Sequence, residues 1–205
     1  MQDKHAEVGR IDQFFSGPGA RADGWRSLVE AAKAWSRGSQ DRNRCETLLG
    51  EIDNESYVRK LPAAFNASIG GHYRHCLDHF RSLLDAAVAG DLNYDHRERG
   101  TLIESDRFAA LNASRALREA YQQLSAGCLE RELDVTCKTS YAASGSQISP
   151  STVGREIMYV VAHAVHHYAL IGIMGGLMGL KMHAGFGVAP STVRHQVDLA
   201  NASRE

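Results

Sequence analysis

The sequence predicts an all-α fold: a four-helix bundle with a short β insertion before its last helix and an N-terminal extension. Two observations support this class. Apolar residues recur at helical spacing over several long segments, and one short segment before the last of them alternates apolar with polar residues. The 205 residues, 43% of them hydrophobic, suffice for one domain with a sizeable core.

Residues 1–21 show no clear periodicity and are expected to form a mobile extension, which leaves a single bundle domain at 22–205. Apolar side chains then share one helical face in each of four segments, namely 25–35, 45–52, 66–88 and 110–124. Pro62 is expected to end the second segment, and Gly90 follows the third.

The β insertion is expected around residues 133–138, where apolar and polar residues alternate. The segment 91–100 is charged and is interpreted as a connection between helices. Residues 149–152 offer capping side chains for an apolar helix that ends near Gly179, and the tail is expected to hold one short helix.

Charge and cysteine content limit the partners and the cellular location that we expect. The chain has 23 Lys and Arg against 24 Asp and Glu, so no basic surplus is available for nucleic acid as the main partner. The four cysteines form no CxxC pair, and no secretory signal is visible. Free thiols in a reducing cytoplasm are therefore expected.

Residues 157–180 contain no Asp, Glu, Lys or Arg and are long enough to cross a membrane. Three histidines lie in the first half of this stretch, and ionisable groups are rare inside membranes. The central helix of a soluble bundle is also apolar on all sides. The sequence thus favours a buried bundle helix and no membrane association.

Six of the ten histidines fall in two of the expected helices: His72, His75, His79, His163, His166 and His167. The i, i+4 pair His163 and His167 projects two imidazoles from one helix face, a spacing that suits a metal ion. On the other helix, His72 and His79 are about 10.5 Å apart along the axis, so they are alternatives rather than partners in one site. His166 lies about 100° from His167 and is expected to point away.

Spacing alone leaves the ligand set open, with His75 able to pair with either His72 or His79. Two alternatives to a divalent metal site remain. The histidines could be buried residues with hydrogen-bond partners and no metal, or two of them could be the axial ligands of a haem. No Walker A loop, GxGxxG, GxSxG, HExxH or Glu-x-x-His pattern points to another chemistry.

Three segments carry a family resemblance: SIGGHYRH at 68–75, VAHAVHH at 161–167 and FGVAPST at 186–192. They resemble the DinB-like (DinB/YfiT) superfamily of metal-binding four-helix bundles, over roughly residues 45–192. The resemblance implies that His75, His163 and His167 are the metal ligands, whereas helical periodicity alone favours His72 or His79. His79 is kept as the alternative ligand because it is i+4 from His75.

Known relatives include thiol-dependent S-transferases that use bacillithiol or mycothiol, and a mycothiol-dependent maleylpyruvate isomerase. The resemblance implies a divalent ion (Zn, Ni or Fe) with an open position, a low-molecular-weight thiol cosubstrate and a small-molecule substrate. Hydrolysis by an activated water is a second chemistry for the same site. The alternative is a non-enzymatic metal- or small-ligand-binding bundle. The sequence does not decide the oligomeric state, and a homodimer is one of the states it allows.

Two residues, Tyr159 and Glu156, lie near the last-helix histidines in the sequence, and charged residues follow the third helical segment. Tyr159, at i−4 from His163, is either its hydrogen-bond partner or a core tyrosine, and the core reading is favoured. Glu156 shares that face but lies too far along the axis for a direct bond to His163. The charged residues of the connection and the next helix are expected to be solvated: Asp95, Arg97, Arg99, Glu104 and Asp106.

Overall fold

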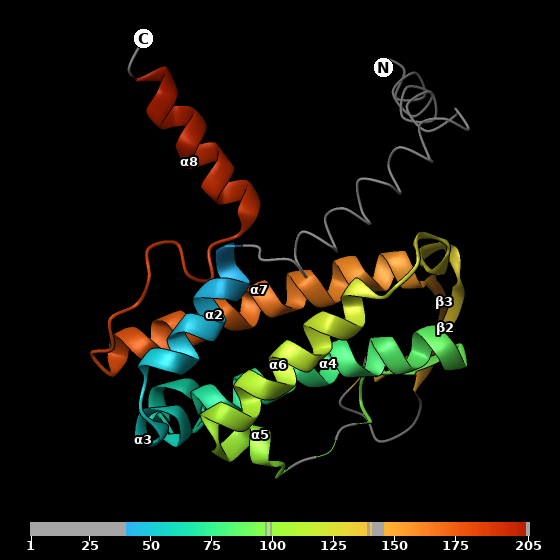
Figure 1. The fold of residues 1–205 in the computed structure, drawn as a ribbon, viewed down its shortest axis with the longest axis horizontal. Coiled ribbons are helices and arrows are strands. Elements are labelled where there is room, and N and C mark those ends of the chain that lie inside the picture. Colours follow the sequence, from blue (N-terminus) through green and yellow to red (C-terminus); the bar gives the residue numbers. More distant parts are fainter. Residues whose placement is uncertain (1–39, 97, 99, 139, 141–145, 204–205) are drawn as a thin grey trace, which may run out of the picture.

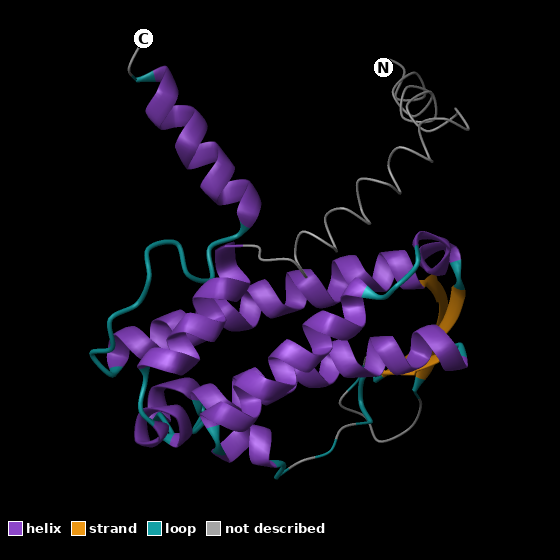
Figure 2. Ribbon diagram, in the orientation of Figure 1, coloured by secondary structure: helices purple, strands orange, loops and turns teal. Residues whose placement is uncertain are grey.

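The computed structural model describes residues 40–96, 98, 100–138, 140 and 146–203. Helices dominate it, as the sequence predicts (Figures 1 and 2). The α-helices are α2 (Gln40–Glu51), α3 (Asn54–Val58), α4 (Ile69–Ala89), α5 (Leu102–Ser105), α6 (Arg107–Gln122), α7 (Val153–Leu177) and α8 (Pro190–Ala202). The expected extension at 1–21 and the expected helix at 25–35 lie outside the described residues.

The bundle is built around α4, which packs against both α6 and α7, while α2 packs against α6 (Figure 1). The apolar residues of α4 lie along one face of the helix that is buried in the core, and they include Tyr73, Cys76 and Leu83. Ser68 caps the start of α4 by accepting a hydrogen bond from the Gly71 amide at 3.0 Å. At the other end, Gly90 adopts a left-handed conformation (φ 96°), which glycine reaches without steric cost.

A small three-stranded sheet closes one end of the bundle. Its strands are β1 (Asp91–Asn93), β2 (Glu132–Cys137) and β3 (Gln147–Thr152), with β2 in the centre. β1 pairs with β2 in parallel and β3 pairs with β2 in antiparallel fashion, with Leu92 opposite Val135 and Val135 opposite Ser149. Because β1 continues from α4 and β3 leads into α7, the sheet connects the two histidine-bearing helices and makes them antiparallel.

The sheet corrects two sequence expectations. The segment 91–100 is not only a connection, because its first three residues form β1. Residues 149–152 do more than cap α7: Thr152 does accept a hydrogen bond from the Arg155 amide, but the four residues also pair with β2. The β2 strand itself lies where alternation predicts it.

The chain before α4 also differs from the expectation. Pro62 does not end a helix that begins near Cys45; α2 already ends at Glu51, and Asp53 caps the separate short helix α3. Pro62 instead opens the 3₁₀ turn Pro62–Ala64, which suits a residue with fixed φ and no amide hydrogen. A second 3₁₀ turn, Ala126–Glu130, precedes β2.

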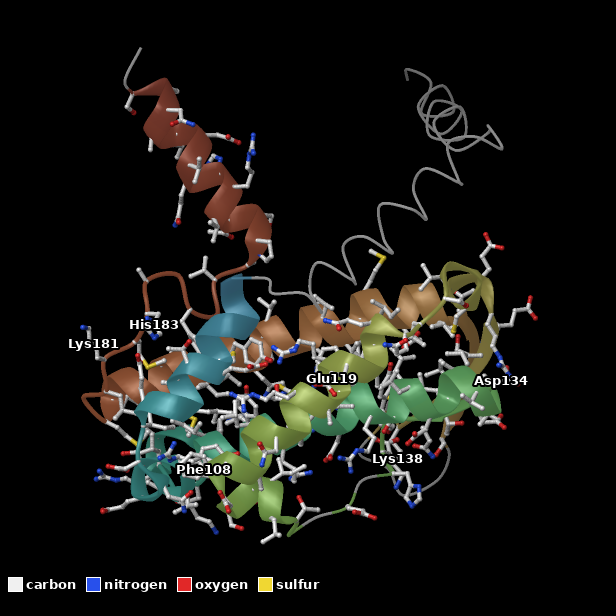
Figure 3. The ribbon with its side chains drawn as sticks, viewed as in Figure 1. Phe108, Glu119, Asp134, Lys138, Lys181 and His183 are labelled. Atoms are coloured by element: carbon white, nitrogen blue, oxygen red, sulfur yellow. The ribbon has the colours of Figure 1, made fainter. Side chains whose placement is uncertain are left out.

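Within the described residues, α7 is the one helix long and apolar enough to cross a membrane by length and composition. Its position argues for a bundle helix, because its contacts with α4 are the most extensive between any two helices. After α7 the chain forms a loop that carries Lys181 and His183 (Figure 3). The helix α8 then extends away from the bundle and buries none of its residues (Figure 1).

Candidate metal centre

The antiparallel helices α4 and α7 bring three histidines together. One nitrogen from each of His75, His163 and His167 lies within 4.8 Å of the other two. Their ring centroids are 4.5–4.9 Å apart, and each pair of rings meets edge to face. These are the three residues that the family resemblance implies as ligands, and the site lies where the two helices contact each other.

The nitrogen spacing fits a small divalent ion. The Nε2 atoms of His163 and His75 are 2.9 Å apart, so one ion can contact both. Two nitrogens bound to one zinc ion at about 2.1 Å in tetrahedral geometry are separated by roughly 3.4 Å, so a small shift of either ring suffices. All three histidines are only partly buried, which leaves a path for an ion and for a further ligand.

Electrostatics favour neutral rings with available lone pairs. Burial, together with the nearby His163 and His72, lowers the pKa of His167 to about 3. Burial also lowers the pKa of His72, with a contribution from His166. At neutral pH these rings are therefore uncharged, which is the form that binds a metal ion.

His72 lies beside the three histidines. Its Nδ1 atom lies 2.8 Å from Nδ1 of His167, with ring centroids 5.1 Å apart, so His72 borders the site. Its nitrogens nevertheless stay outside the group of three. Spacing along α4 alone left His72 open as a ligand, because its position relative to the site depends on the facing helix.

His79 is also outside the group of three nitrogens, which disfavours it as the alternative ligand. It is 4% exposed, and its Nδ1–H donates to the backbone oxygen of His75 at 3.0 Å. Its ring stacks between those of Tyr94 and His163, with centroids 4.9 and 4.2 Å away. His79 thus packs beside the site together with Tyr94 and Tyr159, and these three rings form an aromatic wall.

Tyr159 belongs to the same wall. Its ring is partly buried and stacks on His163 at 5.7 Å between centroids, and it also contacts Tyr94 at 5.1 Å. These ring contacts agree with the packing role favoured by the sequence. His166 is exposed, as its helical position predicts.

Glu156 forms a buried network that sequence reasoning missed. Its carboxylate is fully buried and accepts hydrogen bonds from the Tyr94 hydroxyl at 2.8 Å and the Ser151 hydroxyl at 2.6 Å. The Arg155 guanidinium pairs with it at 2.6 Å. Burial and the Glu156 carboxylate both raise the pKa of Tyr94, which keeps the phenol protonated as a donor. No direct bond joins Glu156 to His163, as expected.

The charged residues of the connection have local partners. Asp106 caps α6, Glu104 pairs with Arg74 at 3.0 Å, and Asp95 accepts from the Lys138 amide at 2.7 Å. Arg97 and Arg99 lie outside the described residues. A cavity of about 610 Å³ opens beside this segment, but none of the three histidines lines it. The interpretation as a connection away from the site is therefore favoured.

Comparison with known proteins gives partial likenesses. One is to a protein of Rhizopus delemar named FK506-binding protein 5, 35% identical over 104 residues, which are 51% of this chain and 27% of that protein. The chain thus spans about a quarter of the length of this relative. Another is to the crystal structure of a DinB-like protein, YjoA, from Bacillus subtilis. It is 18% identical, with a TM-score of 0.49, and the match covers 76% of this chain and 94% of that one.

A family model gives the broader assignment. The model described as the DinB superfamily matches residues 37–171, about two thirds of the chain. This range includes all of α4 and the part of α7 that carries His163 and His167. With the match covering about two thirds of the chain and the histidines of both helices, the chain belongs to the DinB superfamily.

Proposed function

We propose that this protein is a divalent-metal-dependent enzyme that activates a low-molecular-weight thiol for transfer to a small electrophile. The observation that carries the proposal is the group of three imidazole nitrogens within 4.8 Å of one another, contributed by two antiparallel helices. Three neutral nitrogen ligands and a vacant fourth position are the pattern of catalytic rather than structural zinc sites. Zinc, nickel and iron all suit such ligands.

A divalent ion held there would ionise a thiol or a water bound at its open position. The chain's own residues contribute the rest. Burial and the neighbouring histidines disfavour the protonated form of His167, and His75 and His163 each place a ring nitrogen within 4.8 Å of one of its nitrogens. His79 and Tyr159 stack against the His163 ring and restrict its rotation, and Tyr94 packs against both of them.

The competing function is a structural ion in a non-enzymatic bundle, which requires a fourth protein ligand. Among the described residues, no histidine, cysteine or carboxylate joins the three in the same group. The open position therefore favours the enzyme. A cytoplasmic location and a small-molecule substrate complete the proposal, as the composition and the family resemblance imply.

The test begins with metal analysis of protein purified without a nickel column, followed by a thiol screen. Bacillithiol, mycothiol and glutathione would each be offered with 1-chloro-2,4-dinitrobenzene, whose chloride leaves as the carbon–sulfur bond forms. We expect one equivalent of divalent ion and metal-dependent conjugation with at least one thiol. Stoichiometric ion without conjugation or hydrolysis of any substrate offered would favour the structural alternative.

Substitution of the ligands gives the first residue-level prediction. Alanine at His75, His163 or His167 should empty the site, because two imidazoles bind a divalent ion far more weakly than three. Alanine at the exposed His166 should leave metal content unchanged, and it serves as the matched control on α7. Full metal content in the triple alanine variant would exclude the site. Loss of the ion on His79→Ala but not on His75→Ala would reassign the α4 ligand.

A further inference from the structure

We propose that His72 positions His167 for metal binding by accepting a hydrogen bond from its Nδ1–H group, an inference that rests on the proposed metal site. The two Nδ1 atoms are 2.8 Å apart, which is a hydrogen-bond distance between ring nitrogens. His72 lies on α4 one turn before His75, and His167 faces it from α7. The contact is therefore made across the same helix pair that forms the metal site.

The chemistry of the pair fixes which ring donates. Two neutral imidazoles in contact through their Nδ1 atoms need one donor and one acceptor. If His167 accepted, its own proton would sit on Nε2, and both of its nitrogens would be unavailable to an ion. If His167 donates from Nδ1, its Nε2 keeps a free lone pair. Metal binding by His167 thus requires the arrangement in which His72 accepts.

His72 fits the role of a partner rather than that of a ligand. Its nitrogens lie outside the group formed by His75, His163 and His167. Histidines that bind metals usually donate their second ring N–H to an acceptor, which fixes the tautomer and the ring orientation. An imidazole takes that place here, and because it is itself half-buried against α7, its ring has limited freedom.

Three substitutions separate this role from simple packing. In His72→Asn the amide oxygen can occupy the position of Nδ1 and accept the same hydrogen bond. In His72→Gln the amide reaches the position of Nε2 instead, and His72→Phe keeps the ring but has no acceptor. Zinc affinity would be measured by competition with a chromophoric chelator, and the ligand geometry would be followed by the visible absorption bands of the cobalt-substituted protein.

We expect His72→Phe and His72→Gln to weaken zinc binding by about 10- to 100-fold, the usual cost of losing such a partner. His72→Asn should retain most of the affinity and the cobalt spectrum of the unaltered chain. His166→Phe is the matched control, because His166 also contacts the His167 ring, edge to face at 5.3 Å, and should change neither readout. Equal weakening in the Asn and Phe variants would overturn the proposal, as would unchanged affinity in His72→Phe.

The metal-free protein supplies a second readout. Nitrogen-15 spectra of the histidine rings should show His167 protonated at Nδ1 in the unaltered chain and in His72→Asn, and shifted towards Nε2 in His72→Phe. An Nε2 proton on His167 in the unaltered chain would overturn the proposal. Failure of the unaltered chain to bind any divalent ion would overturn the proposed function together with this inference. Tight zinc binding by the unaltered chain with the same affinity in all His72 variants would overturn this inference alone.

Discussion

His167 is surrounded by groups that disfavour its protonated form. Burial contributes most to its low pKa, and the neighbouring histidines on both helices add to it. The same crowding makes the ring available to a metal ion at neutral pH and makes the metal-free protein sensitive to acid. One residue thereby links the binding chemistry to the stability of the fold.

Acid should therefore destabilise the metal-free protein. Above pH 6.5 both folded and unfolded His167 are neutral and contribute nothing. As the pH falls from 6.5 towards 3, His167 becomes protonated in the unfolded chain but stays neutral in the folded chain. The free energy of unfolding therefore decreases. The loss should stay below about 1.4 kcal/mol per pH unit, since solvent reaches this ring.

Urea unfolding at pH 7.5 and 5.5 measures this dependence before most carboxylates titrate. His167→Gln, which cannot titrate, is the control and should show a smaller loss over the same interval. An equal loss in the variant and the unaltered chain would contradict the assignment to His167. With zinc present, the same acidification should release the ion, because protonated imidazole does not bind it.

Glu156 gives a prediction about stability alone. Replacing it with glutamine puts an amide where a carboxylate accepts two hydroxyl groups and pairs with a guanidinium, leaving buried donors without acceptors. The free energy of unfolding should fall by about 1–3 kcal/mol. Arg155→Ala tests the ion pair separately: Arg155 is 64% exposed but the side chain of its partner Glu156 is 1% exposed, so removing the guanidinium should also destabilise the protein. Thermal and urea unfolding of both variants would decide the comparison.

Part of the site was predictable and part was not. The i, i+4 spacing on one helix and the family resemblance on the other led to His163, His167 and His75, which the structure brings together. Their binding of an ion stays a prediction. The contact of His72 with His167 and of Tyr94 with Glu156 joins residues 95 and 62 positions apart, and each depends on how two segments face each other. Periodicity within one helix carries no signal for that.

At the level of elements, the long helices were predictable because each repeats an apolar stripe over many residues. The strand β1 was not, since three residues are too few to show a period and its partner β2 is some forty residues away. The strand β3 was not predicted from the sequence for another reason. Its sequence QISPST has no apolar alternation, and its exposed edge position tolerates Pro150.

Close packing of α4 against α5 depends on one glycine. A methyl group on Gly70 would overlap the backbone oxygen of Glu104 and lie 2.8 Å from a ring carbon of Tyr57. Gly70→Ala should therefore cost about 1–3 kcal/mol of stability, as overpacking does. Gly50→Ala, at an exposed position of α2 with nothing within 4 Å, should be neutral or add up to about 1 kcal/mol. Urea unfolding of both variants checks the contrast, and equal stability would refute the overlap.

At the scale of the whole molecule, the apolar helix α7 decides how the protein behaves in solution. Its contacts with α4 and the placement of its histidines at that contact are those of a bundle helix. We expect the full-length protein to stay in the supernatant after high-speed centrifugation without detergent. Recovery in the membrane fraction, with release only by detergent, would contradict this interpretation. The long apolar run alone could not decide between these outcomes, because buried and membrane helices share that composition.

The sheet and the histidine site connect α4 to α7 at two separate levels. From Val153, where β3 passes into α7, the helix rises about 15 Å before it reaches His163. Local opening of the sheet would let the ends of both helices separate, whereas an ion bound to His75, His163 and His167 would hold them together further along. Metal binding should therefore slow amide hydrogen exchange at Leu92 and Val135, although neither residue belongs to the histidine site.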